Sequence, residues 1–200
     1  AFSGCSELIS IELPSNVTTI GVGAFSGCKR LTSIKIPSEV TSIDNLVFSG
    51  CTALTSIEIS EGVASIGKLA FEDCSGLTSI ELPSSVTAIG DSAFEGCSNL
   101  EEITLPLCGK TLTSYFGADG VPTSLKKVTV VGDTALADGA FVDCSQLTSI
   151  VLPSDLTAIG ESTFAGCTSL EEITLPLCGE MLKDRLGVEA VPDSLKKVTV

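Results

Sequence analysis

Cysteines carry the most reactive side chains of this sequence, since a thiolate can attack a substrate, form a disulfide or bind a metal ion. The chain has nine, and their spacing is regular because they fall on two positions of an internal repeat. Seven share one position and two share the other: Cys5, Cys28, Cys51, Cys74, Cys97, Cys144 and Cys167, then Cys108 and Cys178. The chain has no histidine, so a cysteine nucleophile would lack its usual base and a zinc site a common ligand.

The repeat that carries these cysteines is represented by residues 70–92, AFEDCSGLTSIELPSSVTAIGDS. Its L-x-x-I-x-L segment alternates apolar and polar residues, which predicts a short strand, and the proline that usually follows ends the strand. The valine and isoleucine after the proline suit a second short strand. The next glycine, as at Gly67 and Gly90, predicts a turn with positive φ. Each repeat forms one coil, numbered 1 to 9, that opens at one of nine leucines: Leu8, Leu31, Leu54, Leu77, Leu100, Leu125, Leu147, Leu170 and Leu195.

One coil cannot bury its own apolar residues, so the coils must stack with like residues on top of one another. Seven phenylalanines at one repeat position then form a ladder through the core, which Phe116 continues. Residues 1–200 are therefore predicted to be a single solenoid array of about nine coils of 22–25 residues. We expect an excerpt of a longer protein, because neither end carries the polar cap that solenoids need, and the uncapped edges would allow end-to-end self-association.

Stacking also limits what the cysteines can do. Equivalent residues of neighbouring coils lie about 4.8 Å apart, whereas the Cβ atoms of a disulfide lie about 3.8 Å apart. Cys108 and Cys178 lie three coils apart, about 14 Å at the same spacing. We therefore expect reduced, buried thiols that pack as small hydrophobic side chains, with no metal site and no cofactor. A reactive thiol is the less favoured alternative.

The motif A-F-x-x-C-x-x-L-T-S-I-x-L-P-x-x-V-T-x-I-G resembles the leucine-rich repeats of BspA-type bacterial surface proteins, and the resemblance covers the whole chain. It implies a leucine-rich repeat solenoid, curved and right-handed, with a parallel sheet on its concave side and short strands and turns on its convex side. It also implies an extracellular or cell-surface location and contact with a host protein, a glycan or another cell. Two irregular coils, 100–124 and 170–194, depart from the motif because other residues replace the usual return path.

Charged residues on the expected outer face of the sheet come in adjacent pairs. Two glutamate pairs are each followed, one coil later, by a lysine pair: Glu101 and Glu102 by Lys126 and Lys127, and Glu171 and Glu172 by Lys196 and Lys197. These side chains could form a polar patch that binds a ligand. The favoured interpretation is cross-strand ion pairing, worth about 0.2–1 kcal/mol for each pair, because one chain supplies both charges.

The two irregular coils hold the residue types that usually dominate tight protein contacts. Tyrosine and arginine are frequent hot-spot residues, and loops that interrupt a repeat often form its binding face. The candidates are Tyr115 and Phe116 in the first irregular coil and Met181 and Arg185 in the second. The favoured interpretation is nevertheless that these side chains form a hydrophobic plug where the Phe-Cys turn is missing.

Charge and composition exclude several classes of function. The chain has 11 Lys+Arg against 25 Asp+Glu, a net charge of −14, which argues against binding to nucleic acid or to anionic lipid. No apolar run reaches the roughly 20 residues that span a membrane. The sequence shows no candidate catalytic base, no sign of a cleft and no cofactor-binding motif, so we do not expect an enzyme. The sequence predicts an interaction module for a protein or glycan partner, with a non-binding spacer that presents another domain as the alternative.

Overall fold

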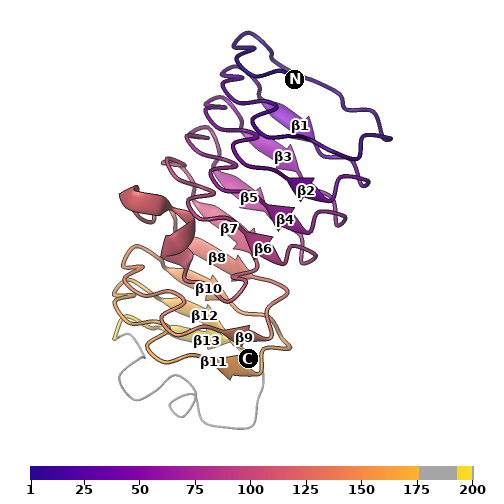
Figure 1. The fold of residues 1–200 in the computed structure, drawn as a ribbon. Helices are drawn as coiled ribbons and strands as arrows, with labels where there is room; N and C mark the ends of the chain where they lie inside the picture. The colour runs from indigo at the N-terminus through magenta and orange to yellow at the C-terminus, as the bar shows by residue number, and fades with distance from the viewer. Residues whose placement is uncertain (176–192, 200) are drawn as a thin grey trace.

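Short parallel strands, one in each of coils 2 to 9, form the long side of the molecule (Figure 1). The computed structural model describes residues 1–175 and 193–199. We call the strands of this side the front sheet: β1 (Ser33–Lys35), β3 (Ser56–Glu58), β5 (Ser79–Glu81), β7 (Glu102–Leu105), β8 (Lys127–Val130), β10 (Ser149–Val151), β12 (Glu172–Thr174) and β13 (Lys197–Thr199). Each strand is the predicted L-x-x-I-x-L segment, and each described pairing is parallel.

The return path of most coils contains a second, two-residue strand. These back strands are β2 (Ser42–Ile43), β4 (Ser65–Ile66), β6 (Ala88–Ile89), β9 (Ala135–Leu136) and β11 (Ala158–Ile159). Equivalent residues pair across neighbouring coils, as Ile80 does with Ile103 in the front sheet and Ile66 with Ile89 at the back. Like residues therefore stack upon like, which confirms the predicted leucine-rich repeat solenoid with its parallel sheet.

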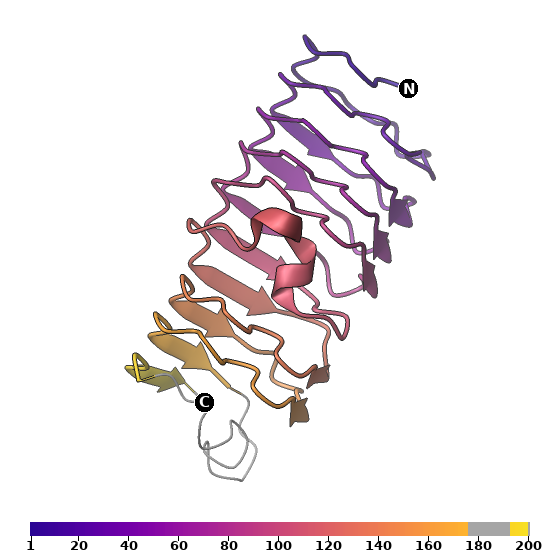
Figure 2. The ribbon, with the colours of Figure 1, turned by 60° about the vertical axis from the view of Figure 1, so that its left-hand side comes forward.

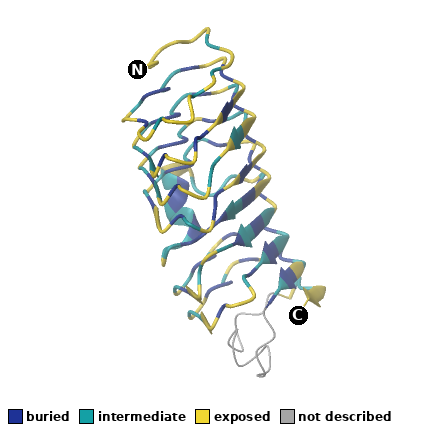
Figure 3. Cartoon of the chain, turned by 90° about the vertical axis from the view of Figure 1, so that its right-hand side faces the viewer, coloured by how far each residue is buried: buried dark blue, intermediate teal, exposed yellow. Residues whose placement is uncertain are grey.

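The core consists of the inward-facing residues of every coil, and the phenylalanine ladder runs through it. Rings of neighbouring coils are parallel and have centroids 5.5–5.7 Å apart, from Phe2 to Phe94 and again from Phe141 to Phe164. Phe116 continues the first ladder as predicted, 6.1 Å from Phe94 but tilted by 40°. The core is buried along the array and more exposed at the first coil, where 37% of Phe2 is accessible (Figure 3).

The front sheet is interrupted once. No ladder joins β3 to β5, so the sheet consists of the pair β1–β3 and a six-stranded part from β5 to β13. The back strands β2, β4 and β6 continue across the same junction, and Phe48 still stacks on Phe71 at 5.5 Å. Ile57 and Ile59 are partly exposed there. The solenoid is thus held together at this junction by its back and its core.

The number of coils is slightly smaller than the nine expected. About seven complete turns are formed by the residues that the structure describes. The reason is that a complete turn needs both a front segment and a return path. Coil 8 has its return path outside the described residues, and coil 9 contributes only β13.

The prediction that the glycines after the back strands have positive φ is wrong. Gly67 and Gly90 do not have positive φ; the described left-handed positions lie elsewhere in the coil, for example at Gly27 and Leu69. A Cβ at Gly67 would lie 2.4 Å from the backbone N of Asn45 in the preceding coil, and a Cβ at Gly90 would lie 2.4 Å from the backbone N of Lys68. Glycine is needed there because adjacent coils touch through their backbones.

Candidate interaction surface

The outer face of the front sheet presents a regular array of side chains to solvent. In β5, Ser79 and Glu81 are exposed while Ile80 between them is buried, and β1 has the same alternation. The front strands lie side by side along the solenoid (Figure 2). Because they are parallel and in register, each outward position forms a row that runs along the solenoid. A partner that contacts this face would therefore meet several side chains at a fixed spacing.

The outward rows differ between the two ends of the front sheet. At the second and third strand positions, coils 2 to 4 carry only threonine and serine, whereas coils 5, 6, 8 and 9 carry the charged pairs. The threonine hydroxyls point back into the stack: Thr55 Oγ1 donates to the carbonyl of Thr32 at 3.2 Å, and Thr148 Oγ1 to that of Lys126 at 3.2 Å. The hydroxyl rows therefore reinforce the contacts between coils as well as facing solvent.

The charged rows form the cross-strand ion pairs that the sequence favoured. Lys127 Nζ lies 3.1 Å from a carboxylate oxygen of Glu102. Near the other end, Lys196 lies 2.6 Å from Glu171 and Lys197 3.5 Å from Glu172. All of these side chains are well exposed, so each pair contributes little to stability.

The pair that would join Glu101 to Lys126 does not form in the same way. Lys126 Nζ donates instead to the carbonyl of Thr123 at 2.8 Å. Within the described part of the chain, the Glu101 carboxylate forms no ion pair. Glu101 and Lys126 are therefore the members of these rows whose charges remain most available to a partner.

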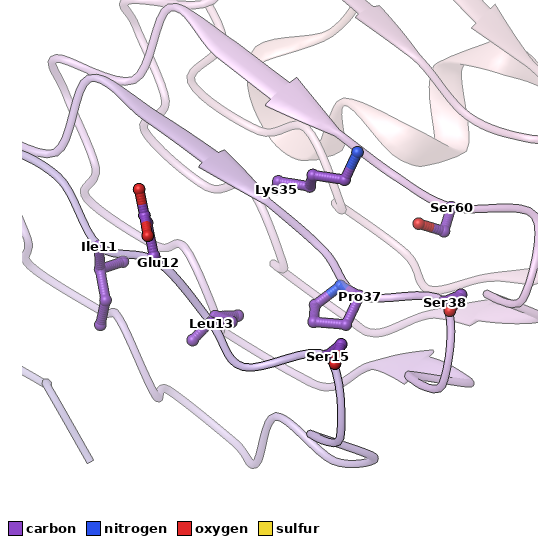
Figure 4. A pocket seen from close by; sticks show the side chains of 8 residues that line it. All are labelled: Ile11, Glu12, Leu13, Ser15, Lys35, Pro37, Ser38 and Ser60. Atoms are coloured by element: carbon purple, nitrogen blue, oxygen red, sulfur yellow. The ribbon is translucent and has the colours of Figure 1, made fainter.

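A shallow groove of about 650 Å³ crosses the first three coils, beside the ends of β1 and β3 and the equivalent segment of coil 1 (Figure 4). Apolar atoms of Leu13 and Pro37 line it, and the polar groups of Glu12 and Lys35 stand at its edge on the front face. Lys35 also forms an ion pair with Glu58 in the next coil. The groove thus combines an apolar surface with charges of both signs, and sequence reasoning missed it because no single repeat position marks it.

The first irregular coil replaces the Phe-Cys turn with two short 3₁₀ helices, η1 (Leu112–Tyr115) and η2 (Gly117–Asp119). They project from the flank of the solenoid (Figures 1 and 2). Tyr115 and Phe116 nevertheless have 0% and 1% of their surface exposed. Both rings therefore form the hydrophobic plug, and neither is accessible to a partner at the surface. A hollow of about 220 Å³ lies beside η2, between Phe116, Asp119 and Pro122.

The plug depends on polar contacts that the regular coils do not have. Tyr115 Oη donates to the carbonyl of Leu107 at 2.5 Å. Asp133, from the next coil, accepts hydrogen bonds from the backbone N–H groups of Leu107 and of Cys108, the latter at 3.1 Å. Burial raises the pKa of Asp133 from its ordinary value, although these two N–H groups oppose the shift. Burial raises the pKa of Tyr115 as well, so the hydroxyl stays protonated and can donate.

Sequence reasoning missed Asp133, yet the signal was present. Leu136 pairs with Ile159 on the back strands, so Asp133 occupies the position of Leu156 in the next coil. Both Leu156 and its equivalent Val86 are buried in the core. A carboxylate at an inward position of an apolar row needs a nearby donor, and the irregular backbone of coil 5 supplies two.

The described cysteines are all free, and their geometry explains why the position favours cysteine. The Sγ of Cys51, Cys74 and Cys97 each lies 3.2 Å from a phenylalanine carbonyl of the preceding coil. Burial raises the pKa of Cys51 and of Cys97 to about 12, which leaves both protonated at neutral pH. Cys5 is exposed and Cys108 partly so, while Cys178 lies outside the described residues.

The buried thiols of Cys51, Cys74 and Cys97 are therefore poor nucleophiles and poor metal ligands, and they act as small core residues that link coils. In the part of the chain that the structure covers, no three His, Cys, Asp or Glu side chains are placed to hold a metal ion. In the same part, none of the helices is long and apolar enough to cross a bilayer. Met181 and Arg185, the candidates of the second irregular coil, lie outside the described residues.

Comparison with known proteins places this geometry among bacterial repeat proteins. A family model described as a BspA type leucine rich repeat region, with six copies, matches residues 1–117 and 123–184. The chain is 32% identical to a leucine-rich repeat protein of T. pallidum (TpLRR) whose structure is solved. The alignment covers 81% of this chain and 78% of that chain, with a TM-score of 0.60. No curated protein sequence matches.

Two further solved structures share the fold. A leucine-rich repeat protein from Bacteroides ovatus is 26% identical over 100% of this chain and 77% of that chain, with a TM-score of 0.50. The pneumococcal vaccine antigen PcpA is 15% identical over 96% of this chain and 42% of that chain, with a TM-score of 0.57. At that identity, the likeness to the pneumococcal antigen concerns the fold alone.

Proposed function

This chain belongs to the BspA-type leucine-rich repeat family, and on that basis we propose that it is an interaction module, outside the cell or on its surface, that contacts a host protein, a glycan or another cell. Leucine-rich repeat proteins are generally interaction modules rather than enzymes. The net charge of −14 makes nucleic acid an unsuitable partner.

The observation that carries the proposal is the front sheet itself. Its outward rows hold exposed polar side chains at a fixed spacing on a packed core, so little conformational entropy is lost when a partner binds. We propose that the ligand contacts the charged pairs, with Glu101 and Lys126 contributing most and Glu102, Lys127, Glu171 and Glu172 less, because their charges are already paired. The groove beside Glu12 and Lys35 is a second contact region.

Each contact should be weak on its own. The described front face has no exposed tryptophan, tyrosine or arginine at its strand positions, the types that dominate tight interfaces. Binding would become useful when many copies of the array are presented together, because a second contact within one assembly forms at a high effective concentration.

A stiff spacer that binds nothing is the second candidate. It is favoured by the internal pairing of Lys127 with Glu102 and of Lys196 with Glu171, which leaves few charges free for a ligand. The two functions differ in one measurable respect, since a spacer has no affinity for any partner at any valency.

Both candidates can be tested with beads that carry many copies of the chain. Binding to mammalian cells and to arrays of matrix proteins and glycans would be compared with that of two front-face variants, Glu101→Ala with Lys126→Ala and Glu12→Ala with Lys35→Ala. The matched control is Asp155→Ala with Glu161→Ala, which removes two exposed charges away from the front strands. We expect the control to bind like the wild type and at least one front-face variant to lose about tenfold or more in apparent affinity. Beads that bind nothing would overturn the proposal and leave the spacer.

A further inference from the structure

The charges of coils 5 to 9 follow an antisymmetric order along the front sheet. At the second and third strand positions the coils carry Glu-Glu, Lys-Lys, Thr-Ser, Glu-Glu and Lys-Lys, in that order. Coils at equal distances from coil 7 therefore carry opposite charges: coil 5 is negative and coil 9 positive, and coil 6 is positive and coil 8 negative. At the fifth strand position the same five coils are uncharged: Thr104, Thr129, Val151, Thr174 and Thr199.

We propose that this face binds a second copy of the chain, front sheet against front sheet, with the two solenoids antiparallel. A two-fold axis parallel to the strands would pass beside Thr148 and Ser149 of coil 7. It would place coil 5 of one copy opposite coil 9 of the other and coil 6 opposite coil 8, so that every glutamate pair faces a lysine pair. Such a two-fold contact is isologous, the commonest kind of homodimer interface. This contact goes beyond the proposed host contact, does not depend on it, and differs from stacking end to end.

The net charge of the chain makes this region the favourable one for self-association. Two copies at −14 each repel one another, and most faces would bring acidic side chains together. The charged pairs of coils 5 to 9 comprise four glutamates and four lysines, so this part of the front face is neutral. Lys127 and Glu102 are exposed, as are the pairs in β12 and β13, so a facing copy can reach them without unfolding.

Nothing described blocks the face. The helices η1 and η2 project from the flank of the solenoid, on the side away from the front strands (Figures 1 and 3). The residues nearest the axis are small, and on either side of them stand long charged side chains. The contact is short, since five strands span about 20–25 Å at the usual spacing. It is therefore smaller than the roughly 800 Å² per partner of a stable interface, and we expect a dissociation constant between about 100 μM and 1 mM.

The test exploits the fact that the same charges pair within one chain and between chains. A half-swap variant exchanges the first two pairs: Glu101→Lys, Glu102→Lys, Lys126→Glu and Lys127→Glu. It keeps the net charge and the ion pairing between coils 5 and 6. In the proposed dimer, however, each pair then faces a pair of like charge. A full-swap variant adds Glu171→Lys, Glu172→Lys, Lys196→Glu and Lys197→Glu, and it restores opposite charges across the dimer.

Sedimentation equilibrium up to about 1 mM chain would compare the three proteins at 0.15 M salt, where charges beyond about 8 Å are screened. We expect the wild type and the full swap to associate to dimers, and the half-swap to stay monomeric or to bind at least about tenfold more weakly. Circular dichroism and melting curves would show that all three are folded. A monomeric wild type would overturn the proposal, as would a half-swap that associates as strongly as the wild type or a full swap that does not associate.

A pair of single substitutions makes the test independent of the multiple exchanges. Ser149→Glu places a carboxylate beside the axis, opposite its own copy, and should weaken the dimer by about tenfold or more. Ser33→Glu adds the same charge to an equivalent exposed serine in coil 2, outside the five-coil overlap. Equal effects of the two substitutions would contradict the proposed register, because only one of them lies in the contact.

Discussion

Two successive coils, residues 77–99 and 100–124, fill equivalent parts of the core with different kinds of side chains. The regular coil fills its part of the core with apolar groups, including Phe94 between Phe71 and Phe116. The irregular coil fills its part with Leu112, Tyr115 and Phe116, and it needs a phenolic hydrogen bond and a carboxylate from the next coil. A regular coil therefore requires only neighbours like itself, whereas the irregular coil requires one particular neighbour.

This difference has an energetic consequence. Stacked phenylalanines gain their stability from buried area and from contact with rings above and below, so any regular coil can be added next to another. The irregular coil buries polar groups, and its stability depends on whether each finds its partner. We expect the two coils to respond in different ways to substitution, and four measurements can establish the difference.

The largest effect is expected in the regular part. Phe71 is fully buried, with Phe48 and Phe94 stacked at 5.5 Å on either side. Phe71→Ala leaves a cavity that the neighbouring rings cannot close, so it should lower the free energy of unfolding by about 3–5 kcal/mol. Urea denaturation monitored by circular dichroism measures the loss.

Phe2→Ala provides the control for this substitution. Phe2 is 37% exposed and, among the described residues, stacks only on Phe25, so the same truncation should cost about 1–2 kcal/mol. Equal losses at the two positions would show that the ladder does not act through close packing.

The second effect concerns the carboxylate that the irregular coil requires. Asp133→Ala leaves the N–H groups of Leu107 and Cys108 without their acceptor, and it should cost about 2–3 kcal/mol. Amide hydrogen exchange at these two residues should become faster, while exchange in coils 2 to 4 should not change. Asp155→Ala, at an exposed position of coil 7, is the control and should cost less than about 0.5 kcal/mol. A similar small loss for Asp133→Ala would mean that the irregular coil is held by packing alone.

The third effect is that of one hydroxyl group. Tyr115→Phe keeps the buried ring but removes the donor to the Leu107 carbonyl, so it should cost about 1 kcal/mol. Tyr115→Ala removes the ring as well and should approach the loss expected for Phe71→Ala. Urea denaturation of both variants separates the hydrogen bond from the packing. A Tyr115→Phe protein as stable as the wild type would show that the plug needs no polar contact.

The regular coils could be predicted from sequence because each is its neighbour's template. Stacking of like residues settles the strand, its register and the inward position of Phe71 together. The same reasoning misplaced the role of Gly67, because the periodic glycine has two possible causes. A turn with positive φ and a close backbone contact both require glycine, so the sequence alone cannot distinguish them. The distance from the glycine to the backbone of the preceding coil shows which of the two applies.

The irregular coil could be predicted only as a departure from the repeat. Its residues have no equivalents above and below, so the sequence predicted a hydrophobic plug but not the hydrogen bond from Tyr115 to Leu107 that accompanies it. Asp133 could have indicated the polar contacts of the irregular coil, because it interrupts a row of apolar residues one coil after the irregular segment begins. The cross-strand pairing of Glu102 with Lys127 was predictable, because the repeat fixes which strand lies beside which.

The smallest effect is a difference in how stability depends on pH. Burial raises the pKa of Asp133 above its ordinary value of 3.8, so the folded state holds a proton there at a pH where the unfolded chain has released it. The stability that this proton provides is fully present below the unfolded pKa, and it is lost as pH rises through the folded pKa. Asp133→Asn keeps a polar side chain of similar size that does not titrate.

The quantity to measure is therefore the stability of the wild type minus that of Asp133→Asn, from urea denaturation at several pH values between 7 and 3.5. The other carboxylates are common to both proteins and cancel in this difference. We expect the difference to rise in favour of the wild type as pH falls through the raised pKa of Asp133 in the folded state, and to level off below the ordinary value of 3.8. A difference that falls instead would mean that the two backbone N–H groups outweigh burial and lower the pKa of Asp133. The irregular coil would then be held by a charge, and the regular and irregular coils would differ even more than the structure indicates.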